Sequence, residues 1–284
     1  MKWSSKNPNV FFGVYNGSGD HNASFWKGTL NTLKTDIKFD LVKTFASNQF
    51  IYDRFTLGKY EGNIDYNDQY VVFAARKKGT KYLTAIVYDI KNNKTIKIKD
   101  FKNISWPDNG QVFDWISISP LGSHILMSSN NKIDQYDREL NFVRHLANSS
   151  GHGDLGIDKD GVEAYVQYEY GANNGIWIYR LSDGFSTRLL PDKYNGGHIS
   201  CRNFKRKGWC YASTTAPGYK EVFSVKLDYS GPENHIVNRF VQTHTSKIRN
   251  SLGNVSPDGK RILFVSDWGD AALNYYDRDT YQAK

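Results

Sequence analysis

The sequence predicts an all-β fold, a β-propeller of six four-stranded blades, with seven blades as the alternative count. Aromatic residues make up 15% of the 284 residues, whereas only two are methionine, and this balance favours strands over helices. One hairpin pattern also recurs six times along the chain. Because propellers of this length routinely form one domain, we expect a single domain over residues 1–284.

The recurring pattern is an apolar strand, a turn rich in Asp, Gly, Asn or Lys, and a second apolar strand. Its clearest copy is 254–266, which turns at Pro257-Asp258-Gly259. The other copies are 3–12, 64–74, 116–128, 156–166 and 200–212. From Ile64 through Ile118, Ile157 and Arg202 to Val255 the steps are 54, 39, 45 and 53 residues. Further strand-like runs follow the hairpins, which favours four-stranded blades over a β-sandwich, the alternative fold.

The charge of the chain limits its partners. A net charge of +8 and a pI near 9.2 attract polyanions, among them nucleic acids, anionic lipids and acidic glycans. The densest cationic run, 205–207, has only three residues, so we expect no nucleic-acid partner. We expect no membrane partner either, because no apolar run approaches the roughly 20 residues of a membrane span. We expect a monomer.

Polar loops suggest where a site would form. In a propeller, the loop that enters a blade and the loop after its second strand open on the same face. His152 and His198 lie in Gly-rich entry loops, and His21 lies in a Gly-rich loop after a second strand. Loops on a rigid scaffold commonly carry function, so these three histidines are candidate functional residues.

The two cysteines suggest a metal site. Cys201 and Cys210 flank the turn 204–208 in the two arms of one hairpin, and His198 precedes Cys201 by three residues. With His152 from the preceding blade, these four residues would suit tetrahedral, structural zinc. Asp154 is a substitute ligand, and a disulfide or two free buried thiols are the alternatives. We expect no organic cofactor.

Three stretches resemble the propeller polysaccharide lyases that cut ulvan, and more weakly the oligogalacturonate lyases. They are Gly-His-Gly-Asp-Leu-Gly at 151–156, Gly-His-Ile-Ser-Cys-Arg-Asn at 197–203 followed by Lys-Gly-Trp at 207–209, and the C-terminal pair 256–259 and 264–269. The resemblance covers the C-terminal half of the chain by these motifs and the N-terminal half by pattern only. Those families have seven blades, whereas we count six units.

The resemblance implies β-elimination at a uronic acid, a structural zinc, and a catalytic His, Tyr and Arg. The matching residues are His21, Tyr60 and Arg76, the last sixteen residues after the tyrosine. Arg76 would neutralise the uronate carboxylate, while His21 and Tyr60 would serve as base and acid, in an order left open. A second histidine upstream of His21, expected in such lyases, has no counterpart.

The substrate would then be an acidic polysaccharide containing glucuronate or iduronate. Arg202, Arg206, Arg249 and Lys77 would bind neighbouring acidic units, His244 would line the cleft, and Trp115 or Trp268 would stack on sugar rings. Such a protein would be secreted or extracellular, although residues 1–5 do not begin a signal peptide. A non-catalytic propeller that binds a glycan or a protein is the alternative function.

Overall fold

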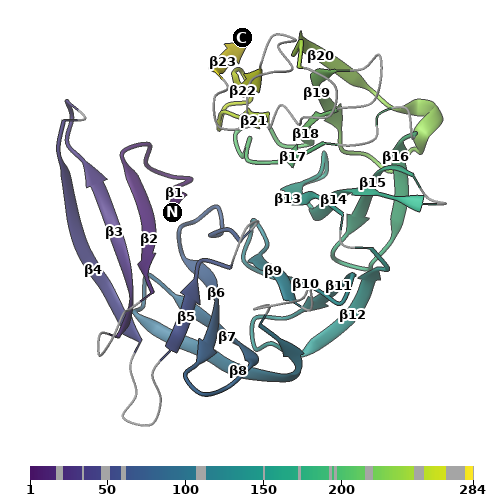
Figure 1. The fold of residues 1–284 in the computed structure, drawn as a ribbon. Coiled ribbons are helices and arrows are strands. Elements are labelled where there is room, and N and C mark those ends of the chain that lie inside the picture. Colours follow the sequence, from purple (N-terminus) through teal and green to yellow (C-terminus); the bar gives the residue numbers. More distant parts are fainter. Residues whose placement is uncertain are drawn as a thin grey trace. The chain divides into compact units, whose positions relative to one another are not determined.

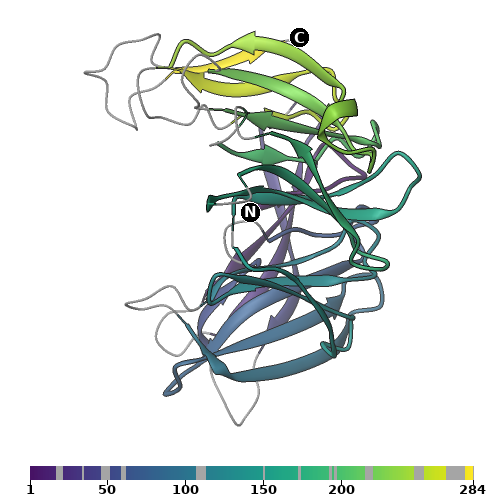
Figure 2. The same ribbon diagram turned by 90° about the vertical axis from the view of Figure 1, so that its right-hand side faces the viewer.

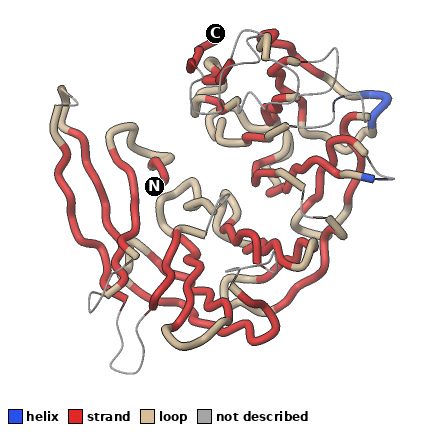
Figure 3. Tube along the Cα trace, viewed as in Figure 1, coloured by secondary structure: helices blue, strands red, loops and turns tan. Residues whose placement is uncertain are grey.

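A computed structural model describes the chain in segments. These are residues 1–16, 22–33, 35–45, 52–58, 62–106, 113–149, 151–171, 174–191, 194, 197–214, 220–245, 253–266 and the backbone of 279–283. The chain divides into two compact units, Met1–Ser150 and Gly151–Lys284. One domain over 1–284 therefore stays a prediction. Strands dominate both units (Figure 3), and among the described residues no helix is long and apolar enough to cross a membrane.

The first unit contains three antiparallel four-stranded sheets in which consecutive strands pair (Figure 1). Blade 1 consists of β1 (Lys2–Trp3), β2 (Val10–Tyr15), β3 (Ala23–Leu30) and β4 (Ile37–Phe45). Blade 2 consists of β5 (Tyr52–Thr56), β6 (Tyr70–Lys77), β7 (Tyr82–Asp89) and β8 (Lys94–Ser105). Blade 3 consists of β9 (Phe113–Ile118), β10 (Ile125–Ser129), β11 (Lys132–Tyr136) and β12 (Phe142–Ala147).

The second unit has the same construction, and its described residues form two four-stranded sheets and one three-stranded sheet. Blade 4 consists of β13 (Gly153–Ile157), β14 (Glu163–Glu169), β15 (Gly175–Arg180) and β16 (Ser186–Leu190). Blade 5 consists of β17 (Ile199–Ser200), β18 (Trp209–Ser213), β19 (Glu221–Lys226) and β20 (Val237–Gln242), with the short 3-10 helix η3 (Pro232–Asn234) before β20. Blade 6 consists of β21 (Asn254–Val255), β22 (Ile262–Ser266) and β23 (Asp279–Ala283).

All six predicted hairpins are confirmed. In blades 1, 3, 4, 5 and 6 they join the first and second strands, and in blade 2 an isolated bridge pairs Ile64 with Val71. Each turn carries one buried or half-buried Ser, Asp or Asn at a matching position. The six residues are Ser4, Asp65, Ser119, Asp158, Asn203 and Ser256.

These side chains close their own turns. The Asp65 Oδ1 atom accepts hydrogen bonds from the backbone N–H groups of Gln69 at 2.6 Å and Tyr70 at 2.8 Å. Asp158 Oδ1 does the same for Asp160 and Val162, both at 2.9 Å. Ser, Asp and Asn suit this position because their short polar side chains reach the nearby backbone. The turn residues are therefore a structural part of the repeat.

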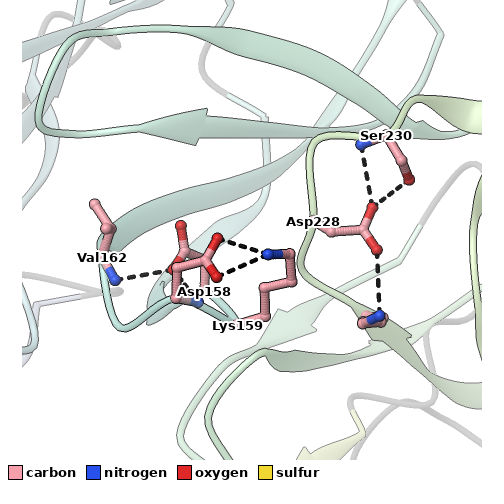
Figure 4. A network of polar contacts seen from close by, with 7 residues as sticks. Asp158, Lys159, Val162, Asp228 and Ser230 are labelled. Atoms are coloured by element: carbon pink, nitrogen blue, oxygen red, sulfur yellow. Dashed lines mark hydrogen bonds and ion pairs between the residues drawn. The ribbon is translucent and has the colours of Figure 1, made fainter.

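The Asp158 turn also contacts blade 5 (Figure 4). The backbone N–H of Lys159 donates to the carbonyl of Leu227 at 3.3 Å, and the neighbouring Asp228 accepts two hydrogen bonds from Ser230. The Lys159 ammonium pairs with Asp160 at 2.7 Å. A backbone hydrogen bond therefore joins blades 4 and 5 at this end. The nearby charges of Lys159 and Asp228 have partners within their own turns.

Apolar side chains fill the space between neighbouring blades of each unit. Phe25 of β3 and Phe73 of β6 have ring centroids 5.1 Å apart between blades 1 and 2, and both are fully buried. In the second unit, Val166 of β14 and Phe223 of β19 belong to one core cluster. Fully burying such a side chain contributes roughly 1.5–3 kcal/mol, so blade packing is a main source of stability.

Candidate functional site

Arg76 lies near the end of β6, where its guanidinium already holds a carboxylate. Its Nε donates to Asp53 Oδ1 at 2.9 Å and its Nη2 donates to Asp53 Oδ2 at 3.1 Å, a two-point pairing across β5 and β6. The arginine side chain is only 11% exposed. Binding a uronate carboxylate at these two donors would therefore require displacement of Asp53. His21 and Tyr60 lie outside the described residues, so the predicted catalytic set stays a prediction.

His152 and His198 come together in the second unit, at matching positions of blades 4 and 5. Their ring centroids are 4.5 Å apart, and the planes are inclined by 41°. Each histidine carbonyl accepts a hydrogen bond from the second strand of its blade, from Tyr168 at 3.0 Å and from Ser213 at 2.9 Å. His152 is exposed and His198 is half-buried. The two imidazoles therefore form an accessible pair.

Glycine makes this placement possible. A Cβ on Gly151 would lie 1.7 Å from the Tyr168 carbonyl oxygen, and one on Gly197 would lie 1.7 Å from the Ser213 carbonyl oxygen. Gly197 also has φ +143°, which disfavours other residues. Each histidine follows such a glycine, so close backbone approach to the second strand sets its position. The glycine before each histidine was the sequence signal for this pair.

Tyr168 links the two blades beneath the histidine pair. Its hydroxyl donates to the Ser213 carbonyl at 2.9 Å, and its ring is fully buried. Burial raises the pKa of Tyr168 far above its ordinary value, so the hydroxyl keeps its proton. Tyr168 therefore has a positioning role rather than an acid–base role.

Cys201 and Cys210 form a disulfide in this structure, with Cα atoms 4.4 Å apart. This is one of the two alternatives to the zinc site, and it removes both thiolates from the ligand set. The nearby Asp154 carboxylate accepts a hydrogen bond from the Cys201 backbone N–H at 2.8 Å. With the disulfide intact, the chain offers two adjacent imidazoles and not the four predicted ligands. Zinc binding to four ligands therefore stays a prediction that applies only to the reduced chain.

One predicted substrate-binding residue, Trp115, needs correction, and a second, Arg206, has contacts within its own turn. Trp115 is only 2% exposed, because it points into the interior of the first unit, so it cannot stack on a sugar ring in this structure. The Arg206 guanidinium lies 4.4 Å from the Trp209 ring and donates to the Tyr211 hydroxyl at 2.6 Å. Arg206 lies in the turn between β17 and β18, whereas His198 precedes β17, so the two residues are at opposite ends of β17. Arg206 therefore helps to pack this turn, and substrate binding by Arg206 stays a prediction.

Four other residues were predicted to bind the substrate. Arg202 is half-buried, and His244 is exposed after β20 with φ +52°. Arg249 and Trp268 lie outside the described residues. The roles of these four side chains stay predictions.

The structure adds a surface that sequence reasoning missed. An open groove of about 440 Å³ lies at the outer edge of blade 4, lined by Trp177, Ser186, Thr187, Arg188 and Pro232. Trp177 and Arg188 are direct cross-strand neighbours on β15 and β16. Arg188 makes no ion pair with another described residue. An indole, a guanidinium and two hydroxyls are groups that suit an acidic sugar, and the alternation of side chains along 175–180 and 186–190 could have indicated that Trp177, Ser186 and Arg188 share one face.

Comparisons with known proteins identify the fold. No family model matches the chain, and no curated protein does. Among solved structures, the oligogalacturonate lyase of Vibrio parahaemolyticus aligns with 99% of this chain and 76% of its own, with a TM-score of 0.59 and 13% identity. The chain has a β-propeller fold. The fold class predicted from the hairpin repeat is thereby confirmed, and the six sheets agree with the count of six blades.

Other structures share this fold. An oligogalacturonate lyase in complex with manganese aligns with 100% of this chain and 88% of its own, with a TM-score of 0.59 and 12% identity. Kuenenia stuttgartiensis hydrazine synthase aligns with 99% of this chain and 85% of its own, with a TM-score of 0.52 and 13% identity. The chain spans 58% of the length of TolB from Acinetobacter baumannii, at a TM-score of 0.49. Because this fold carries several activities, function depends on the site.

Proposed function

We propose that the protein is a polysaccharide lyase that cleaves an acidic, uronic-acid-containing polysaccharide of the ulvan type by β-elimination. The observation that carries the proposal is the likeness to oligogalacturonate lyases, which extends over 99–100% of this chain. The ulvan-lyase-like stretch 151–156 runs from the loop before β13 into that strand, and the stretch 197–203 contains β17. Their two histidines are the pair that the structure brings together.

The reaction breaks the bond between C4 and O4 of the sugar. A base removes the C5 proton, the C–H electron pair forms the C4=C5 double bond, and O4 leaves with a proton from an acid. The carbanion at C5 develops next to the carboxylate, so a cation at that carboxylate lowers the barrier. We assign this cation to Arg76. Before substrate binds, the Asp53 carboxylate occupies the position of the substrate carboxylate. His21 and Tyr60 serve as the base that removes the C5 proton and the acid that protonates O4, in an order left open.

Two further features support an extracellular polysaccharide as substrate. The Trp177 groove offers an aromatic surface beside the guanidinium of Arg188. The Cys201–Cys210 disulfide suits an oxidising compartment, which is where secreted proteins keep such bonds. We therefore propose a secreted protein whose partner is the polysaccharide itself.

The experiment is to mix the protein with ulvan, glucuronan, pectate and alginate and to follow absorbance near 235 nm, where the unsaturated uronate absorbs. We expect a rise with at least one of the polymers and no rise with Arg76→Ala. The control is Arg144→Ala, which removes an arginine from β12. Binding of a polymer without any rise in absorbance would refute the lyase and would favour the non-catalytic propeller.

A further inference from the structure

The positive charge of the chain is concentrated in blade 2. Residues 77–102 contain eight lysines and two aspartates, a net charge of +6 out of +8 for the whole chain. They span the turn between β6 and β7, the whole of β7, and most of β8. We name the eight residues the lysine strip: Lys77, Lys78, Lys81, Lys91, Lys94, Lys97, Lys99 and Lys102.

Most lysine side chains of the strip face solvent. Six of the eight lysines are exposed, whereas Lys77 and Lys99 are half-buried. Those two have internal roles, since Lys77 pairs with Asp100 at 2.6 Å and Lys99 donates to the Leu140 carbonyl at 2.8 Å. No carboxylate among the described residues forms an ion pair with Lys78, Lys91, Lys94 or Lys97. These four charges are therefore available to an external anion.

The strip follows the outer edge of its sheet. The strand order is β5, β6, β7, β8, so β8 has no strand on its far side within blade 2 (Figures 1 and 2). From Lys94 to Lys102 the strand extends for roughly 26 Å at about 3.3 Å per residue. The Lys77–Asp100 pair brings the turn between β6 and β7 to the far end of this line. Arg76, the proposed carboxylate-binding residue, directly precedes Lys77.

Protection of an edge strand does not explain this many charges. Lysine on an edge strand discourages pairing with another chain. The outer strand of blade 1, β4, contains only Lys38 and Lys43, and it exposes Phe39 by 57% and Leu41 by 52%. The outer strand of blade 3, β12, contains no lysine. The charge of β8 therefore exceeds what its place in the sheet requires.

We propose that the lysine strip binds an acidic polysaccharide chain along β8 and leads it toward Arg76. The proposal rests on the proposed function for the identity of the polymer. Lysine ammonium groups are compact point charges that suit carboxylates and sulfates spaced along a chain. Single-stranded nucleic acid is less suited, because its bases stack on exposed aromatic rings, whereas Tyr88 and Phe101 are buried.

The test compares two variants that lose the same charge. The strip variant combines Lys94→Gln, Lys97→Gln and Lys102→Gln. The matched control combines Lys6→Gln, Lys132→Gln and Lys260→Gln, which are exposed lysines on other blades. Because all six side chains are exposed, both variants should fold, and their melting temperatures verify this. Affinities for ulvan and glucuronan are measured by titration calorimetry at low and at high salt.

We expect the strip variant to bind polymer about tenfold more weakly at low salt, and the control to change less than twofold. The salt dependence should also fall in the strip variant, since fewer ion contacts remain. In the 235 nm assay KM for polymer should rise, while kcat and the cleavage of short oligosaccharides stay unchanged. Equal affinities of the two variants would overturn the proposal. Tighter binding to single-stranded DNA or to anionic vesicles, at equal charge concentration, would also overturn it.

Failure of the two proposals can be told apart. Loss of polymer binding in the strip variant, without any absorbance rise in the wild type, supports the strip and refutes the lyase. An absorbance rise in the wild type with equal affinities of the two variants supports the lyase and refutes the strip.

Discussion

Reduction of the Cys201–Cys210 disulfide should lower stability by an amount that follows from its loop length. The two cysteines are separated by 9 residues. The entropy that such a closed loop removes from the unfolded chain is worth about 2.7 kcal/mol at 25 °C. For 284 residues that unfold together, this free energy lowers the melting temperature by about 4 to 5 °C. Both sulfurs are buried between blades 4 and 5, so the reductant must act on transiently opened protein.

The assay is thermal unfolding of the oxidised and the reduced protein, together with a thiol titration of the unreduced, denatured chain. We expect no free thiol before reduction and two after it. The control is the double variant Cys201→Ala/Cys210→Ala, whose melting temperature reductant should not change. Two free thiols in the unreduced chain would refute the disulfide. A chelator-sensitive melting temperature with one equivalent of bound zinc would then support the four-ligand site with His152 and His198.

Three further predictions concern stability. Tyr168→Phe should cost about 1–2 kcal/mol in the free energy of unfolding by denaturant, because the Ser213 carbonyl loses its donor; an unchanged value would show that this bond does not link the blades. Asp65→Asn should raise stability more at pH 7 than at pH 3.5. Burial raises the pKa of Asp65, so the wild type is most stable when this carboxyl is protonated and loses stability as pH rises through the folded pKa. The opposite trend in pH-dependent melting would contradict this sign. Arg206→Ala should lower stability by about 1 kcal/mol but leave affinity for polysaccharide unchanged, and a tenfold loss of affinity would restore it to the binding site.

The sequence predicted the repeat well because its signals are local. The turn residues and the alternation of apolar side chains lie within about a dozen residues, so each hairpin could be recognised without knowledge of its neighbours. The glycines before His152 and His198 likewise indicated matching positions in two blades. The proximity of those two rings could be predicted by assuming only that consecutive blades pack side by side.

Side-chain partners across strands were harder to predict. Asp53 and Arg76 are 23 residues apart in the sequence. Nothing in either segment indicates that the two side chains form an ion pair. Trp115 was expected to stack on a sugar ring, whereas it lies within β9 and is buried. The lysine strip escaped a search for contiguous cationic runs, because its lysines are spaced along strands and turns.

The six turns that close on their own Ser, Asp or Asn side chains bear on the order of folding. Each turn satisfies its backbone within a few residues, so a hairpin can acquire its register before any neighbouring blade is present. Such hairpins form in about 1–10 μs, much faster than the assembly of sheets from distant segments. The rate-limiting step is then the docking of preformed hairpins, in which the large aromatic side chains between blades find their partners. In such a chain the slow folding steps come late, after the hairpin of each blade has reached its native register.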